Sequence, residues 1–144
     1  MQKHVLVPYD DSEQSTAALE FAIEQHPDAT ITALHVVEPG DVYTWIGMED
    51  AATADQDRLR DTQQEWAEEV LEAARERAAE LGVEIDVDRA LGVPAREIVE
   101  YAAEHGVDHV VIGSHGRSGA QRVLLGSVAE TVARRSPVPV TVVH

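Results

Sequence analysis

Five strand-like segments alternate with four segments of helical periodicity, and this alternation restricts the fold of the chain more than any other feature. A short, almost continuously apolar run such as His4–Tyr9 suits a strand covered on both faces, as in a parallel sheet. The β-α-β-α-β-α-β-α-β order predicts an α/β fold, in which a five-stranded, mostly parallel sheet carries helices on both faces. The predicted strands are His4–Tyr9, Ile31–Val37, Glu84–Leu91, Val107–Ile112 and Val138–Val143.

The predicted helices rest on apolar residues that recur every three or four positions and on residues that favour helix ends. The first helix follows two N-cap candidates, Asp11 and Ser12, and capping is the main role expected for Asp11. A long second helix ends at Gly82, a good C-terminal stop. The third runs from Pro94 to Gly106, and the fourth runs from Ser127 to Arg135.

The length and composition indicate a single globular domain over residues 1–144. The chain has no cysteine, which excludes disulfides, cysteine-ligated metals and thiol catalysis. No apolar run approaches the ~20 residues that cross a bilayer, and no leader precedes the first strand. We therefore expect a cytoplasmic protein that does not associate with membranes.

The charge balance is strongly acidic, with 27 Asp and Glu against 11 Lys and Arg and a formal net charge of -16. Such a field repels nucleic acid and anionic lipid, so neither is expected as a partner. The carboxylates are spread along the chain rather than gathered in a tail, and Lys3 is the only lysine. This pattern favours a halophilic protein, in which high salt screens the repulsion between carboxylates.

A glycine-rich segment follows the fourth predicted strand and begins Gly113-Ser114-His115-Gly116-Arg117. Glycines let backbone N–H groups approach an anion, and the helix that opens at Ser127 would turn its positive end toward the same anion. Arg117 and Arg122 could add charge-assisted hydrogen bonds. Tight-turn glycines and an S-x-x-E capping box from Ser127 to Glu130 explain the same residues without a ligand, and the two readings stay open.

The spacing of these glycines resembles the nucleotide-binding signature of the universal stress protein family. Gly113-x-x-Gly116 is followed, after nine intervening residues, by Gly126-Ser127. The resemblance extends over the whole chain through three further segments, which are Val5–Ser12, Leu34–Val36 and Ser136–Val140. It implies a Rossmann-like sheet of the adenine nucleotide alpha hydrolase type that binds ATP. Mg²⁺ is expected to arrive with the triphosphate.

The resemblance also implies a role for each matching position. Asp10 would hold the ribose hydroxyls, Pro8 would shape the turn after the first strand, and the backbone of Val36 would meet the adenine edge. The phosphates would lie between two groups of residues, Gly113, Gly116 and Arg117 on one side and Gly126, Ser127 and Val128 on the other. The chain departs from the family at Ala129, where many members have a hydroxyl residue that contacts phosphate.

Residues 39–54 show no clear periodicity and predict a loop. Tyr43 and Trp45 in this loop could cover an adenine or pack on the long helix, and packing is favoured. His115 could act as an acid, a base or a phosphate partner, but with no orienting partner identified it is left outside the predicted site.

The function predicted from these features is a nucleotide-dependent regulatory or stress-response module that acts on an unidentified downstream protein. The alternative is a slow ATPase or phosphoryl-transfer enzyme, for which Asp10, Asp11 and His115 form no recognised catalytic constellation. No metal site is predicted. The family resemblance further implies a homodimer that pairs through Val138–Val143, and pairing would also cover an apolar edge strand.

The halophile hypothesis predicts that the free energy of unfolding rises with KCl concentration, because added salt screens carboxylate repulsion. Chemical unfolding followed by circular dichroism across a KCl series measures this dependence. Full stability in dilute buffer would contradict the hypothesis.

Overall fold

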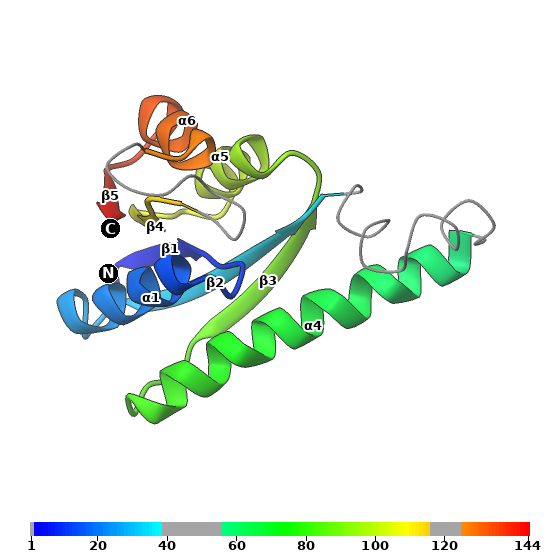
Figure 1. Cartoon of the computed structure of the whole chain (residues 1–144). Coiled ribbons are helices and arrows are strands. Elements are labelled where there is room, and N and C mark those ends of the chain that lie inside the picture. The colour runs from blue at the N-terminus through cyan, green and yellow to red at the C-terminus, as the bar shows by residue number, and fades with distance from the viewer. Residues whose placement is uncertain (1, 39–55, 116–124) are drawn as a thin grey trace.

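The computed structural model describes residues 2–38, 56–115 and 125–144, with the backbone alone at 56–60, 62 and 63. Five strands form one parallel sheet in the order β3-β2-β1-β4-β5 (Figure 1). The sheet confirms the predicted five-stranded α/β architecture. The strands are β1 (His4–Pro8), β2 (Thr30–Val37), β3 (Asp86–Leu91), β4 (His109–Gly113) and β5 (Val140–Val143).

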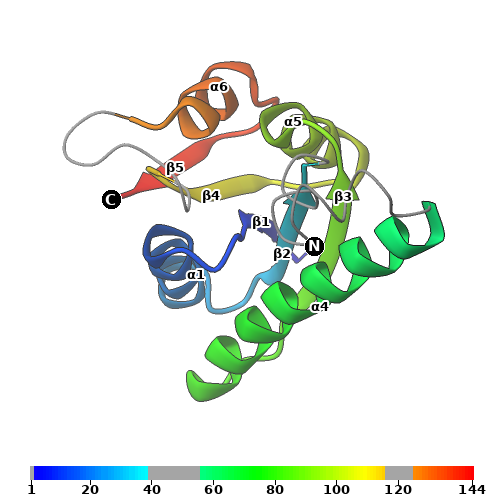
Figure 2. The same cartoon turned by 45° about the vertical axis from the view of Figure 1, so that its right-hand side comes forward.

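The helices cover both faces of the sheet, as the nearly continuous burial along β1, β2 and β4 requires. On one face, α1 (Glu13–Gln25) and α4 (Gln56–Glu80) pack over a core that includes Val5 and Val7 (Figure 2). On the other, α5 (Pro94–Glu104) and α6 (Ser127–Arg135) pack over a core that includes Leu6. None of the helices in the described ranges is long and apolar enough to span a bilayer.

The edge strands are shorter than the sequence predicted. β3 begins at Asp86, where its register with Thr32 of β2 starts, rather than at Glu84. β5 begins at Val140 rather than at Val138, because the Ser136 side chain holds the main chain of Val138 in a local turn. The Ser136 hydroxyl donates to the Val138 carbonyl at 2.8 Å and accepts from the Val138 N–H at 3.1 Å.

The strand order reverses between β1 and β4, and these neighbours part toward their carboxyl ends. Their register contains only Val5↔His109 and Leu6↔Val110, whereas β1 pairs with β2 as far as Pro8↔Leu34. Open parallel sheets bind ligands at such a reversal, outside the carboxyl ends of the strands. We call this place the switch point.

Pro8 gives a physical reason for the parting of β1 from β4. The His4 carbonyl accepts from Asp108 just before β4, while the Tyr9 N–H donates to Leu34 of β2. Backbone groups point alternately to the two neighbours, so Pro8 falls on the β4 side. A proline has no N–H to donate there, and the hydrogen-bonded ladder to β4 cannot continue through it.

At the opposite end of the sheet, the rings of His26 and His109 lie 5.3 Å apart between centroids. His109 Nε2 is 2.7 Å from the Thr141 hydroxyl of β5. Burial, followed by the charge of Lys3, lowers the pKa of His26. Burial, followed by the charges of His26 and Lys3, lowers the pKa of His109. Folding therefore favours the neutral form of both imidazoles.

This pair predicts a loss of stability in mild acid. The unfolded chain binds protons at these histidines more readily than the folded chain does. The contribution of the two neutral histidines to the free energy of unfolding should therefore be fully present above pH 6.5, the ordinary pKa. It should decrease as the pH falls below that value. His109→Gln keeps an N–H within reach of Thr141 but cannot titrate, so its unfolding should depend less on pH. His144→Gln, at the exposed chain end, is the control, and equal pH dependence in all three proteins would contradict the prediction.

Candidate functional site

The turn that follows β1 is held by side-chain to main-chain hydrogen bonds. Asp10 Oδ1 accepts from the Ser12 N–H at 3.0 Å, and the Ser12 hydroxyl accepts from the Ser15 N–H at 3.1 Å. Ser12 is thus the N-cap of α1, and the capping role predicted for Asp11 is wrong. Asp10 follows the end of β1, which places its carboxylate at the switch point.

Asp11 does not cap because its backbone takes the left-handed conformation, with φ at 64°. Among non-glycine residues, aspartate tolerates this conformation comparatively well. Its Oδ1 accepts from the Tyr9 hydroxyl at 3.2 Å, and that hydroxyl also lies 3.3 Å from the Thr16 hydroxyl. Burial, with a smaller contribution from Asp11, raises the pKa of Tyr9, so the phenol stays a hydrogen-bond donor.

The main chain of Val36 faces the switch point from β2. The Leu34 carbonyl bonds to Tyr9 and the Val37 carbonyl accepts from Gly92, so even-numbered residues of β2 point toward β1. The β1–β2 register ends at Pro8↔Leu34, which places the backbone of Val36 beyond the paired part of β1. Its half-buried side chain packs with the α5 and α6 face of the core.

Gly113 and Gly126 allow three backbones to approach closely at the end of β4. A Cβ on Gly113 would lie 2.7 Å from the carbonyl carbon of Gln14 in α1. A Cβ on Gly126 would lie 2.7 Å from the carbonyl oxygen of Ser114, which accepts a hydrogen bond from the Gly126 N–H. Packing alone therefore requires both glycines, and any role toward a ligand comes in addition.

The amino end of α6 has no side-chain cap from the part of the chain that the structure describes. Gly126 is the N-cap, Ser127 is the first helical residue, and no described side chain makes a capping hydrogen bond. The Glu130 carboxylate accepts from Arg134 instead of reaching back to the helix end. The S-x-x-E capping box is thus not formed, and the first-turn N–H groups keep their partial positive charge for an anion.

His115 is a feature of this end of the sheet that the predicted site omitted. Its side chain is 7% exposed, and its Nδ1 lies 3.1 Å from the Ser114 hydroxyl. Its buried Nε2 has no hydrogen-bond partner among the described residues. The signal in the sequence was the position of this histidine, two residues after the end of a buried strand. Two residues of the predicted site, Gly116 and Arg117, lie outside the described residues. So do Arg122, Tyr43 and Trp45, for which the sequence left a ligand contact open.

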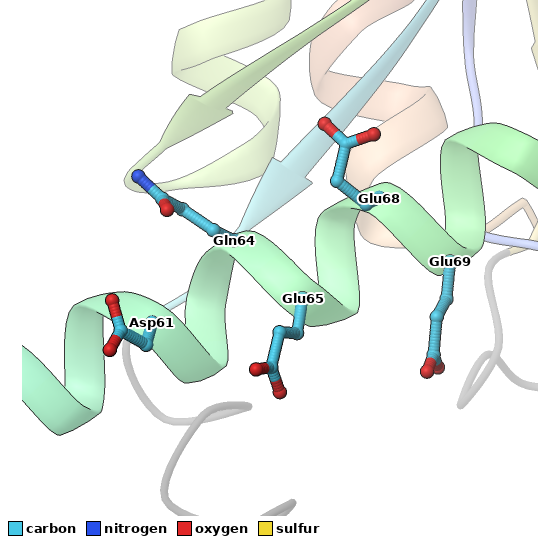
Figure 3. Close-up of a pocket in the computed structure, with 5 residues that line it drawn as sticks. All are labelled: Asp61, Gln64, Glu65, Glu68 and Glu69. Atoms are coloured by element: carbon cyan, nitrogen blue, oxygen red, sulfur yellow. The ribbon is translucent and has the colours of Figure 1, made fainter.

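A shallow hollow along α4 has a different chemistry. It is lined by Gln64 and four carboxylates, which Figure 3 shows directed to different sides of the helix. Glu68 is paired with Arg89 at 2.8 Å. Across the described ranges, no group of three histidine, aspartate or glutamate side chains could hold a metal ion. The hollow therefore repels phosphate and offers no cage for a cation.

The whole chain, residues 1–144, matches the model of the universal stress protein family. The chain belongs to this family. It is 36% identical over 145 residues to universal stress protein MJ0531 of Methanocaldococcus jannaschii, covering 99% of this chain and 82% of that protein. It is 35% identical over 148 residues to universal stress protein YxiE of Bacillus subtilis, covering 100% of both chains.

Solved structures of universal stress proteins share the fold. Protein MJ0577 of Methanocaldococcus jannaschii superposes with a TM-score of 0.79 at 30% identity, covering 99% of this chain and 96% of that one. A universal stress protein in complex with cAMP superposes with a TM-score of 0.71 at 30% identity, covering 99% of this chain and 97% of that one.

The packing at the end of β4 predicts that Gly113→Ala and Gly126→Ala each cost about 1–3 kcal/mol of stability, because backbone atoms must shift to admit a methyl group. Ser127→Ala, at an exposed position with no capping bond, should be close to neutral. Urea unfolding measures all three. The prediction would be contradicted if both glycine variants were as stable as the wild type. It would also be contradicted if Ser127→Ala lost as much stability as the removal of an N-cap does. A glycine variant that lost nucleotide binding would not by itself locate a phosphate site.

Proposed function

We propose that this universal stress protein binds ATP, together with Mg²⁺, at the switch point and acts as a nucleotide-dependent regulatory module. One observation carries the proposal. The Asp10 turn, the Val36 main chain and the uncapped end of α6 all lie at the carboxyl end of the sheet where its strand order reverses. The cAMP complex of a structural relative supports an adenine nucleotide as the ligand.

The phosphates are assigned to the amino end of α6. The N–H groups of Ser127 and Val128 belong to a first turn that no side chain in residues 2–38, 56–115 or 125–144 caps. Gly126 brings this turn against the main chain of Ser114, and the preceding residue Gly113, the last of β4, packs against Gln14 of α1. Gly116 and Arg117, outside the described residues, complete the proposed phosphate contacts by family resemblance.

The nucleoside is assigned to the ends of β1 and β2. The Asp10 carboxylate suits the two adjacent hydroxyls of a ribose, because carboxylate oxygens accept strong hydrogen bonds from hydroxyl groups. The Val36 main chain suits the polar edge of adenine, which carries both a donor and an acceptor. Pro8 stops the ladder between β1 and β4, which leaves space beside the end of β1.

The proposed role is regulatory because Asp10, Asp11 and His115 form no recognised catalytic constellation. Asp11 accepts from Tyr9, and the Nδ1 of His115 faces the Ser114 hydroxyl. Phosphoryl transfer needs a group that orients the attacking oxygen, in addition to a metal. Mg²⁺ itself commonly binds through substrate phosphates with only one or two carboxylates, so it would arrive with the triphosphate.

We also propose that two copies of the chain pair through β5. Both edge strands of the sheet present unpaired backbone groups, but their side chains differ. β3 carries charged side chains at Asp86, Asp88 and Arg89, which oppose pairing with another edge. β5 reads Val-Thr-Val-Val and has no charge, so it is the edge that a second copy can extend.

Calorimetric titration of nucleotide-stripped protein with Mg-ATP in high KCl tests the proposed function. We expect saturable binding of one ATP per chain without phosphate release, and light scattering of the same sample should give the mass of a dimer. Phosphate release at a steady rate would favour the enzyme instead. A folded protein that binds no adenine nucleotide would overturn the proposal.

Asp10→Asn makes the same titration specific for the ribose contact, because an amide oxygen can still accept from the Ser12 N–H. We expect ATP affinity to fall about 10-fold or more, in line with the loss of a hydrogen bond to a charged group. Affinity for 2′,3′-dideoxy-ATP, which lacks the ribose hydroxyls, should barely change. Asp28→Asn, in the turn at the other end of the sheet, controls for the change in net charge. Equal losses for both nucleotides would refute the ribose contact.

A further inference from the structure

A buried histidine, His35, makes a hydrogen bond at the end of β2 that a backbone group would ordinarily make. Its side chain is 7% exposed and lies on the α4 side of the sheet, with its ring centroid 6.4 Å from that of Trp66. Its Nδ1 lies 2.9 Å from the carbonyl oxygen of Tyr9. A carbonyl oxygen only accepts, so Nδ1 carries the proton in this bond.

The bond replaces the next step of the ladder between β1 and β2. The Tyr9 N–H already donates to the Leu34 carbonyl at 2.8 Å, as in a regular parallel pair. In such a pair the Tyr9 carbonyl would then accept from the N–H of Val36. Instead, the imidazole of His35 donates a hydrogen bond to that carbonyl, and the paired register ends at Pro8↔Leu34.

This substitution has two consequences for the switch point. First, both main-chain polar groups of Tyr9 are bonded to β2, and Tyr9 directly precedes Asp10 and the positive-φ backbone of Asp11. Together with the bond from Tyr9 to Leu34, the His35 bond therefore constrains the direction in which the chain leaves β1. Second, the Val36 main chain, which points toward β1, is not drawn into the ladder by Tyr9.

We propose that His35 is a positioning residue for nucleotide binding. By taking the Tyr9 carbonyl in place of the Val36 N–H, it aims the Asp10 carboxylate and keeps the Val36 main chain available to the base. This inference rests on the proposed function, because it assigns His35 a role toward the ribose and adenine contacts. His35 acts through Tyr9 and touches no ligand itself.

A matched pair of variants separates the hydrogen bond from the space that the side chain fills. His35→Asn keeps an N–H donor at the branch position that Nδ1 occupies, while His35→Leu has the same branching and no donor. Removing a buried hydrogen bond that positions a charged ligand contact should weaken ATP binding about 10-fold or more in His35→Leu. The Asn variant should stay within about threefold of the wild type, since the donor is restored.

Hydrogen exchange supplies a readout that a merely structural role would not change. In the nucleotide-free wild type, the Val36 amide should exchange quickly and become protected when ATP binds. In His35→Leu the released Tyr9 carbonyl can accept from Val36, so this amide should already be protected without ATP. Circular dichroism and thermal unfolding confirm that both variants are folded.

The outcomes distinguish the inference from the proposed function. Weak binding by the Leu variant, rescue by the Asn variant and early protection of the Val36 amide support the inference. Equal affinities for wild type and His35→Leu overturn it and leave the proposed function standing. The inference is also overturned if both variants lose ATP affinity equally and the exchange of the Val36 amide does not change, because His35 would then be purely structural. A wild type that binds no adenine nucleotide overturns both.

Discussion

The way β1 ends is the constraint on which the rest of this site depends. Toward β4, the ladder stops because Pro8 has no N–H to donate. Toward β2, it stops because the His35 side chain takes the Tyr9 carbonyl. The central strand is thus released from both neighbours within a few residues, at the reversal of strand order. A parallel sheet that stayed paired to its last residue would have no room for a ligand there.

The turn after β1 and the amino end of α6 are both stabilised from within the protein. Asp10 and Ser12 accept main-chain N–H groups of the turn, and Asp11 adopts a left-handed conformation that its contact with Tyr9 supports. At α6, Gly126 packs against the Ser114 carbonyl with no side-chain cap. The first arrangement holds a carboxylate in a defined direction. The second leaves main-chain donors for an anion.

The acidic surface is balanced by arginine at several places in the described part of the chain. Arg77 of α4 contacts Glu20 of α1 and Glu80, and Arg89 of β3 contacts Glu68 of α4. These contacts join neighbouring elements around the edge of the sheet. Exposed pairs of this kind are each worth about 0–1 kcal/mol, so they do not offset a net charge of -16. The predicted salt dependence of stability would therefore be a property of the whole surface.

The sequence by itself determined the element order, the parallel sheet and the two-sided core, because hydrophobic periodicity reports local burial directly. It also placed Asp10 at the end of β1, since a polar residue that follows a buried strand must lie at its edge. The cap of α1, the unformed capping box of α6 and the reason for Gly113 and Gly126 were decided only by the tertiary structure. Each depends on backbone atoms from segments distant in sequence, such as Gln14 against Gly113. The role of His35 is of the same kind, because its hydrogen bond joins two strands 26 residues apart and no local pattern encodes that distance.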